Sequence, residues 1–276
     1  MQKCKVYHTG VYEFEEAVIK DNKVYICGNR DKLYYPEEMF MAREECEEGL
    51  IQLAVNGKWG FADIYSGEIK IKPTWDFVDP FYFGYAHVVL NANANEYSAG
   101  RFEVTGGKHG YINKNGDLVI PVEYDGAEIV SLRGNFLVSK DGKWGVVDKN
   151  NKVLIPFEYD YLRKNYDDDL VFGGKRVLPK PSLEQAIKQN LWWDYGIKWG
   201  VFDKQFNIIV MPELDKMPYI CEVKYDKDDN WSHIKKKYYI LKRKRRYGVL
   251  CVDGRLITDV SLLKRDAVYL VKVLSD

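Results

Sequence analysis

Short runs in which apolar and polar residues alternate recur along most of this chain, and turn signals separate neighbouring runs. Asn56-Gly57 divides two such runs early in the sequence, and Asp141-Gly142 divides two more near its middle. Asn-Gly and Asp-Gly between alternating runs predict antiparallel hairpins, because these residues accept the positive φ of a tight hairpin turn. The pattern therefore predicts β-strands over most of the chain.

A short motif, an aromatic residue followed by glycine, recurs in phase with these hairpins. The five copies are GKWGFAD from Gly57, GKHGYIN from Gly107, GKWGVVD from Gly142, IKWGVFD from Ile197 and RRYGVLC from Arg245. Their aromatic anchors are Trp59, His109, Trp144, Trp199 and Tyr247. Repetition of one short unit predicts an array in which the units stack, because a single unit of this size cannot bury its own apolar face.

The spacing inside each copy predicts a second hairpin. Asp63, Asp148 and Asp203 stand four positions after their anchors, and a Gly or Asn follows shortly afterwards, which is turn chemistry. The next apolar stretch is the partner strand, and Pro121 or Pro156 is expected to end the pairing because proline has no N–H to donate. The glycine after the anchor is expected to let a neighbouring strand or ring approach closely. Each unit is thus predicted to be a three-stranded antiparallel meander.

The N-terminal region contains a degraded sixth copy of the unit. The segment VYICGNRDKLYYP, which begins at Val24, keeps a strand, a turn and a proline but has no tryptophan. We assign residues 1–50 to a degenerate capping unit with a short helix, because terminal repeats are commonly atypical. Five units follow over 51–260, and a C-terminal strand or cap covers 261–276, all within a single β-repeat domain over residues 1–276.

Insertions interrupt the repeat. The anchors are 50, 35, 55 and 48 residues apart, which indicates a basic period of 35. Residues 91–100 (NANANEYSAG) and 163–181 are interpreted as loops because of their small and polar composition. One short helix is predicted after Ser182, which forms a capping box with Gln185, and another is predicted over 37–48. Insertions in a repeat array often gather on the binding face.

The predicted fold is therefore all-β, with about six stacked meanders and two short inserted helices. Closure into a propeller-like ring would remove the free sheet edges. The unequal insertions and the degraded first unit favour an open, solenoid-like array instead.

The repeated motif resembles the WG repeat family of bacterial proteins, also called KWG repeats. Lys-Trp-Gly stands at 58–60, 143–145 and 198–200, with the Asp and Ile-Pro positions in phase. The resemblance covers approximately 51–260 and implies a repetitive, β-rich binding module rather than an enzyme. His109 and Tyr247 depart from the tryptophan of the family pattern.

Composition narrows the class of protein. Lys and Arg number 41, as do Asp and Glu, and the resulting net charge of zero argues against a dedicated nucleic-acid binder or a polybasic membrane protein. No apolar run approaches the ~18 residues of a membrane-spanning helix, and the N-terminus lacks the apolar run of a signal peptide. The five cysteines are isolated from one another, which is typical of a reducing compartment. We therefore expect a cytoplasmic protein that does not enter a membrane.

The sequence carries no recognisable catalytic motif. It has neither a G-x-S-x-G elbow nor a phosphate-binding G-x-x-x-x-G-K-[ST] loop. The histidines His8, His87, His109 and His233 are far apart and lack metal-ligand spacing. We expect no catalytic residue, cofactor or metal ion, and we interpret the repeated Asp residues as turn residues and the tryptophans as core residues.

One strongly charged segment stands out, KKKYYILKRKRR at 235–246. Its basic residues are Lys235, Lys236, Lys237, Lys242, Arg243, Lys244, Arg245 and Arg246. Cations interleaved with Tyr238 and Tyr239 suit a nucleic-acid backbone and its bases. The same pattern also suits a strand edge protected by lysines, or a surface for an acidic protein.

Three functions follow from the sequence. The first is a non-catalytic scaffold that binds another protein through its stacked units and inserted loops, for which the 21 tyrosines provide suitable contact residues. The second is a nucleic-acid or nucleotide binder that acts through 235–246. The third is an enzyme whose site is assembled from loops without a local signature.

Overall fold

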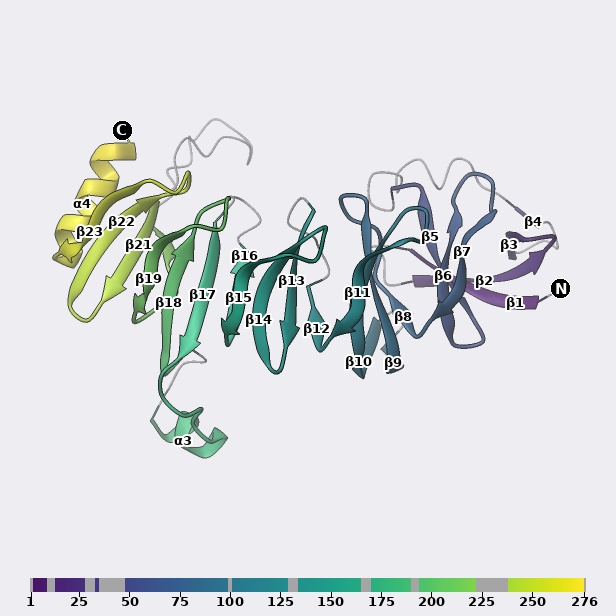
Figure 1. Ribbon diagram of the computed structural model, residues 1–276, viewed down its shortest axis with the longest axis horizontal. Coiled ribbons are helices and arrows are strands. Elements are labelled where there is room, and N and C mark those ends of the chain that lie inside the picture. The colour runs from purple at the N-terminus through teal and green to yellow at the C-terminus, as the bar shows by residue number, and fades with distance from the viewer. Residues whose placement is uncertain are drawn as a thin grey trace. The chain divides into compact units, whose positions relative to one another are not determined.

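The computed structural model describes residues 2–8, 13–27, 33–34, 48–98, 101–128, 134–164, 170–189, 194–221 and 238–275. The predicted all-β repeat array is confirmed in this part of the chain, which consists mainly of antiparallel strands (Figure 1). The chain forms two compact units, Met1–Leu154 and Ile155–Asp276. The assignment of both to a single domain stays a prediction, and each unit is described by itself.

The first compact unit, Met1–Leu154, begins with one continuous seven-stranded sheet. Its strands are β1 (Gln2–His8), β2 (Glu13–Lys20), β3 (Lys23–Cys27), β4 (Leu33–Tyr34), β5 (Leu50–Val55), β6 (Lys58–Asp63) and β7 (Ile69–Trp75), in the order β4-β3-β2-β1-β5-β6-β7. The sheet curls so that the β2–β3 turn meets the β6–β7 turn, where Val24 N donates to Gly67 O over 2.8 Å. Residues such as Cys4, Val6 and Leu53 form the apolar cluster of this sheet. The N-terminal strands therefore share a sheet with the first WG-type unit.

Four sheets of four strands follow along the chain. In the first unit they include β8 (Phe77–Val78), β9 (Tyr85–Ser98), β10 (Arg101–Asn113), β11 (Leu118–Tyr124), β12 (Gly126–Ala127), β13 (Asn135–Lys140) and β14 (Lys143–Asp148). The next strands are β15 (Val153–Tyr159), β16 (Tyr161–Lys164), β17 (Val171–Arg176), β18 (Ile197–Phe202), β19 (Ile208–Leu214), β20 (Tyr219–Cys221), β21 (Tyr238–Arg243), β22 (Arg246–Cys251) and β23 (Leu256–Leu262).

Each of these sheets contains one predicted three-stranded meander and one short additional strand. The sheet orders are β11-β10-β9-β8, β12-β13-β14-β15, β16-β17-β18-β19 and β20-β21-β22-β23. The short strands β8, β12, β16 and β20 come first in the sequence of their sheets. The anchors His109, Trp144, Trp199 and Tyr247 lie on the third strand of these sheets in chain order, and Trp59 lies on β6, the middle strand of its own meander.

Two helices lie in the described residues. Helix α3 (Leu183–Lys188) begins after Ser182, which forms the predicted capping box with Gln185. Helix α4 (Lys264–Ser275) occupies most of the segment assigned to a terminal strand or cap, and it packs Ala267 and Val271 against the last sheet. The helix predicted over 37–48 lies outside the described residues, apart from Glu48 in a turn.

The glycine after four of the five anchors lies where two strands approach closely, as the sequence predicts. A Cβ added to Gly60 would lie 2.3 Å from the Ile71 oxygen, and one added to Gly200 would lie 2.7 Å from the Val210 oxygen. Gly110 and Gly248 are similarly crowded by backbone atoms. No side chain fits at such distances, so glycine is required for these strands to pair.

The expectation that proline ends the pairing is wrong. Strands β7, β11, β15 and β19 continue past Pro73, Pro121, Pro156 and Pro212. In the first WG-type unit the register shifts between Trp59 and Phe61, so that Trp59 still pairs with Trp75 beyond the proline. The proline lies at this β-bulge, opposite the anchor glycine, where the ladder is interrupted and an N–H is not needed.

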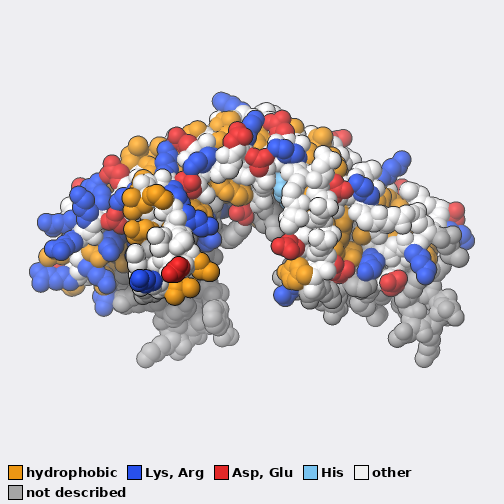
Figure 2. Space-filling view, turned by 90° about the horizontal axis from the view of Figure 1, so that it is seen from below, with side chains coloured by type: hydrophobic (Ala, Val, Ile, Leu, Met, Phe, Trp, Pro, Cys, Tyr) orange, Lys and Arg blue, Asp and Glu red, His pale blue; other side chains and the backbone are white. Residues whose placement is uncertain are grey.

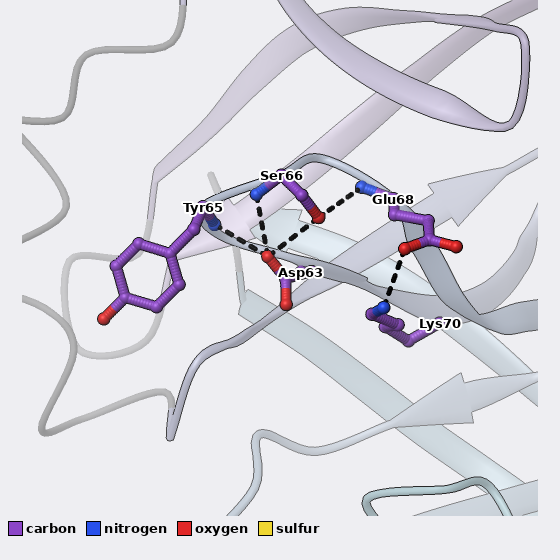
Figure 3. A network of polar contacts seen from close by, with 5 residues as sticks. All are labelled: Asp63, Tyr65, Ser66, Glu68 and Lys70. Atoms are coloured by element: carbon purple, nitrogen blue, oxygen red, sulfur yellow. Dashed lines mark hydrogen bonds and ion pairs between the residues drawn. The ribbon is translucent and has the colours of Figure 1, made fainter.

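The predicted turn chemistry is confirmed in detail at Asp63 (Figure 3). Its Oδ1 atom accepts hydrogen bonds from Tyr65 N at 3.0 Å and from Ser66 N at 2.8 Å, while Lys70 pairs with Glu68 on the outgoing strand. Burial opposes ionisation of Asp63, but these donors outweigh it and lower its pKa. Equivalent pairs of main-chain N–H groups bond to Asn113, Asp148 and Asp203, and Asp253 accepts one from Arg255 in the last unit.

The first predicted loop is a strand over its described residues, and the second is partly strand. Residues 91–98 extend β9, because Asn and Ala alternate there with the two-residue period of a strand. Within 163–181, β16 and β17 account for 163–164 and 171–176. Gly173 and Gly174 are strand residues that make room for rings: a Cβ on Gly173 would lie 2.8 Å from the ring of Tyr159.

Candidate functional site

Two of the five repeat anchors belong to the core. Trp59 and Trp199 are 4% and 0% exposed, which confirms the core interpretation for both. His109, Trp144 and Tyr247 are partly buried. Because the two buried tryptophans have no exposed face, they cannot provide a stacking platform for a base or a sugar.

The described residues of the basic segment 235–246 are buried in their own sheet or bonded to it. Tyr238 and Tyr239 are 4% and 2% exposed, so neither ring is available to stack on a base. Arg243 pairs with Glu213, and Arg246 donates to the Ser261 carbonyl at 3.1 Å. Lysines and arginines are frequent over this sheet and α4, at the left of Figure 2.

The remaining basic residues of the segment fall into two groups. Lys242, Lys244 and Arg245 lie at the β21–β22 hairpin, and the side chain of Arg245 is exposed. Lys235, Lys236 and Lys237 lie outside the described residues. Contact between this segment and a partner or nucleic acid stays a prediction.

In three repeat units, an aspartate that the sequence analysis missed links the meander to the next hairpin. The Asp76 Oδ1 atom pairs with Lys58 at 2.6 Å, and its Oδ2 atom accepts from Asn91 N at 2.5 Å. Asp125 likewise pairs with Lys108 at 2.5 Å and accepts from Asp141 N at 2.7 Å. Asp215 holds Lys198 and the Lys244 N–H in the same way. The signal was available in the sequence, since each such lysine precedes an anchor and each such aspartate follows the repeat proline by three or four positions.

A second arrangement that the sequence analysis missed joins Asp79, His87 and His109 in the first unit. His87 Nδ1 lies 2.7 Å from Asp79 Oδ2, and His87 Nε2 lies 2.8 Å from His109 Nδ1. The planes of the two imidazole rings are nearly parallel, 6° apart, and their centroids are 5.0 Å apart. Sequence separation hides this contact, because it depends on the register of β9 and β10.

The histidine pair is a packed hydrogen-bonded element. Burial and, secondarily, the neighbouring His87 lower the pKa of His109 from 6.5 to about 4, so His109 is neutral at pH 7. His87 is 5% exposed, and both of its ring nitrogens are engaged. The expected packed ring at His109 is therefore confirmed. No group of three His, Cys, Asp or Glu side chains in the described residues could hold a metal ion.

The first unit contains a groove of about 480 Å³ between the first sheet and the long β9–β10 hairpin. Its lining residues are Lys3, Cys4, Lys5, Tyr7, Glu16, Ala54, Asn56, Gly57, Trp59, Asp76, Ala92, Asn93, Ala94, Asn95 and Phe102. Tyr7, Trp59 and Phe102 form an aromatic cluster with ring centroids 4.6–5.4 Å apart. Lys5 pairs with Glu96 at 3.7 Å and so connects β1 with the hairpin.

The second unit exposes apolar side chains on the insert at residues 177–196. This segment links β17 to β18 and carries α3 away from the sheet (Figure 1). Leu183 and Ile187 are 78% and 73% exposed, and α3 has no buried residue. Val177 is also 56% exposed at the base of the insert. The insert therefore presents an apolar surface that its own unit does not cover within the described residues.

No helix in the described ranges is both long and apolar enough to cross a membrane. A search of the curated proteins gave no match. Among solved structures, the chain is similar to a crystal structure of a eukaryotic initiation factor, with 8% identity, a TM-score of 0.38 and coverage of 95% of this chain and 74% of the other. It is also similar to dihydro-heme d1 dehydrogenase NirN in complex with DHE, with 9% identity, a TM-score of 0.25 and coverage of 96% and 74%. These low scores carry no argument about fold or function.

The comparison with protein families gives a match to defined segments of the chain. The model of the WG containing repeat matches residues 59–93, 110–144 and 144–172. These segments contain the anchors Trp59 and Trp144 together with the meanders built around them. Within residues 59–172, the chain therefore carries WG-containing repeats.

Proposed function

We propose that this protein is a non-catalytic scaffold that binds another protein through its repeat surface and the insert at residues 177–196. The observation that carries the proposal is the exposure of Leu183 and Ile187, 78% and 73%, on a helix with no buried residue. These two side chains stand four positions apart and so share one face of α3. Large exposed apolar surfaces commonly mark sites of protein contact.

The length of α3 supports the same conclusion. A helix of six residues is far below the roughly 12–15 residues at which an isolated helix becomes even marginally stable in water. The Ser182–Gln185 capping box satisfies its first turn, but no side chain of the helix is buried in its own unit. A partner with an apolar groove would bury Leu183 and Ile187 together and stabilise the helix in the same step.

The proposal also includes a cellular location, the cytoplasm. Cys4 and Cys251 are buried and form no disulfide, which suits a reducing compartment such as the bacterial cytoplasm. A soluble partner in that compartment is accordingly the one to seek.

The test is capture of partners by tagged full-length protein from native lysate, with and without nuclease, read by mass spectrometry. The variant Leu183→Glu/Ile187→Glu charges the apolar face, and Glu184→Gln/Lys188→Gln is the matched control on the polar face. We expect a discrete protein that survives nuclease, is retained by the control and is lost from the apolar-face variant. Circular dichroism should show both variants folded, because α3 has no buried residue.

Two outcomes would contradict the proposal. Retention of the same partner by Leu183→Glu/Ile187→Glu would show that the insert is not the contact surface. Recovery that disappears on nuclease treatment would transfer the function to nucleic acid and to residues 235–246.

A further inference from the structure

We propose that the groove of the first unit binds a neutral saccharide. Such binding would be a function beyond the scaffold role, at a site separate from the insert that carries α3. The two proposals therefore rest on different observations, and each has its own test.

The groove lies over one face of the first sheet. Lys3, Lys5 and Tyr7 stand at alternate positions of β1 and therefore point to the same face. Glu16 and Ala54 are the direct strand partners of Lys5, which places them on that face as well. Side chains of this face form one wall of the groove.

The opposite wall is the face of the β9–β10 hairpin that is turned towards the sheet. The Glu96 carboxylate pairs with Lys5 of the sheet at 3.7 Å, so Glu96 lies on that face. Ala94 and Ala92 precede Glu96 by two and four positions and share its face. Phe102, the direct partner of Glu96 on β10, lies on the same face. The groove is thus a space between two layers of side chains.

Small side chains leave this space open. Sheets that pack face to face lie about 10 Å apart, and longer side chains normally fill the gap between them. Here the two walls present the methyl groups of Ala54, Ala92 and Ala94. The resulting groove has a volume of about 480 Å³, which lies within the range of known ligand sites.

The aromatic rings beside the groove offer little surface for stacking. Tyr7 and Trp59 are only 6% and 4% exposed, and their ring centroids lie 4.6 Å apart. Neither ring can therefore accept a flat aromatic ligand such as a nucleobase. The alanine methyl groups suit an aliphatic ring instead, whose C–H groups can pack against them.

The polar lining residues supply both donors and acceptors of hydrogen bonds. The Lys3 ammonium donates, the Glu16 carboxylate accepts, and the Asn56 amide does both. Within the described part of the chain, Lys3 and Glu16 form no ion pair, so both are available to a ligand. A sugar hydroxyl is both a donor and an acceptor, and it can bond to any of these groups.

The charge of the lining favours a neutral ligand. Lys3 and Lys5 are balanced by Glu16 and Asp76, and Lys5 and Asp76 are each already in an ion pair. The lining thus has neither the clustered cations that hold a phosphate nor the clustered carboxylates that hold a polyamine. An uncharged aliphatic ring that carries several hydroxyl groups meets all these requirements, which identifies a neutral saccharide as the ligand class.

The test uses the full-length protein and a panel of neutral sugars, namely glucose, galactose, mannose, N-acetylglucosamine, maltose and lactose. Saturation-transfer-difference NMR detects binding, and titration of the signal gives relative affinities. We expect at least one sugar to bind, with transfer strongest to the C–H protons of one ring face, because that face contacts the alanine methyl groups. In the saturated protein, hydrogen exchange should slow at the amides of residues 92–95.

Charged derivatives of the same ring test the ligand class. Glucosamine adds a positive charge to glucose, and glucose 6-phosphate adds negative charge. We expect neither derivative to bind more tightly than the neutral sugars, because the lining has no net charge.

Substitutions provide the matched comparison. Ala94→Phe fills the groove, whereas Thr105→Phe adds the same ring on β10 outside it. We expect Ala94→Phe to weaken sugar binding by about tenfold or more and Thr105→Phe to leave it within about twofold. Glu16→Ala removes one acceptor and should weaken binding about three- to tenfold, whereas Glu103→Ala, outside the groove, should not. All four positions are at least partly exposed, so circular dichroism should show every variant folded.

The variant Leu183→Glu/Ile187→Glu should bind the sugars as the wild type does, which distinguishes this site from the insert. Three results would overturn the proposal: absence of binding across the panel, binding of a charged derivative about tenfold more tightly than any neutral sugar, or equal affinity of Ala94→Phe and wild type. Binding of acetylated and amidated octapeptides that Ala94→Phe abolishes, with no sugar bound, would identify a polypeptide as the occupant and would likewise overturn it.

Discussion

At the level of single residues, the glycine that follows the anchor determines whether two neighbouring strands can pair at the β-bulge. At Gly60 an added Cβ would lie 2.3 Å from a backbone oxygen, that of Ile71. Backbone atoms cannot move aside as the end of a flexible side chain can, so the whole strand would have to shift. The repeat proline lies opposite this glycine at the same bulge. The two residues together shape the β-bulge of the repeat.

We therefore expect Gly60→Ala to destabilise the protein by about 1–3 kcal/mol, the usual range for overpacking a well-packed site. The control is Lys72→Ala at an exposed position of the neighbouring strand, expected to change stability by less than about 0.5 kcal/mol. Urea unfolding followed by tryptophan fluorescence measures both. Equal midpoints for Gly60→Ala and wild type would refute the close approach.

His109 makes stability depend on pH. Burial and His87 lower its folded pKa to about 4, with Lys108 acting in the same direction and Asp79 and Asp125 opposing. The unfolded chain binds the proton near pH 6.5 and the folded chain only near pH 4. Unfolding thus takes up a proton within this window, so His109 reduces stability as pH falls from about 6.5 towards 4.

We expect His109→Gln, which keeps an N–H donor for His87 but does not titrate, to lose less stability than wild type on acidification. Urea midpoints at about pH 7.5 and about pH 5 measure the effect. An identical loss in both proteins would show that His109 does not carry this pH dependence.

At the residue scale, the sequence allowed correct prediction of what repeats. Asp63 and its equivalents open turns, and Gly60 and its equivalents permit close approach, because each recurs with the unit. The Asp79–His87–His109 contact occurs once, and it depends on strand register that no single-residue pattern reveals. Its prediction would have required the pairing of β9 with β10 in advance.

At the scale of elements, the repeated aspartates connect the end of one meander with the next hairpin. Asp76 follows β7 and bonds to the N–H groups of Asn91 and Ala92 in β9. Burial opposes its ionisation, but the Lys58 ammonium and the two N–H groups outweigh burial and lower its pKa. Its backbone bonds hold the middle of β9, and the residues that follow on β9 form one wall of the groove.

The two halves of this contact should differ in strength. We expect Asp76→Ala to cost about 1.5–3 kcal/mol, because it removes hydrogen bonds between a charged group and the backbone. Lys58→Ala should cost only about 0.2–1 kcal/mol, since that side chain is half exposed and forms a surface ion pair. Unfolding of both single variants and the double variant measures the difference. A larger loss for Lys58→Ala would mean that the ion pair, rather than the backbone contact, connects the elements.

The boundaries of an element were predictable where a specific turn or cap motif marks its end. They were not predictable where the only guide was amino-acid composition. The hairpins at Asn56-Gly57 and the capped helix after Ser182 follow from local rules. Residues 91–98 were misassigned as a loop because small polar residues outweighed their two-residue alternation. The groove itself could not be predicted, because its lining residues on β1 and β9 are far apart in sequence.

At the scale of the whole molecule, the repeat pattern predicted the all-β array, whereas charge limits what the array can bind. Lys and Arg equal Asp and Glu in number, so no net field attracts a polyanion. Local pairing acts in the same direction, because Arg243 is bonded to Glu213, and Lys198 to Asp215. With Tyr238 and Tyr239 buried, the segment at 235–246 also lacks the exposed rings of a single-strand binder.

We therefore expect weak binding of single-stranded RNA that is nearly lost at physiological salt. Anisotropy of a fluorescein-labelled 20-nucleotide strand at about 50 and about 150 mM NaCl measures it, since contacts with several phosphates would produce a steep salt dependence. Lys242→Glu/Arg245→Glu reverses two charges of the β21–β22 hairpin, and Lys70→Glu/Lys72→Glu does the same on β7 as the control. Both pairs should change the weak binding equally, because a non-specific contact responds to total charge. Tight binding by wild type that only the hairpin variant abolishes would instead establish residues 235–246 as a nucleic-acid site.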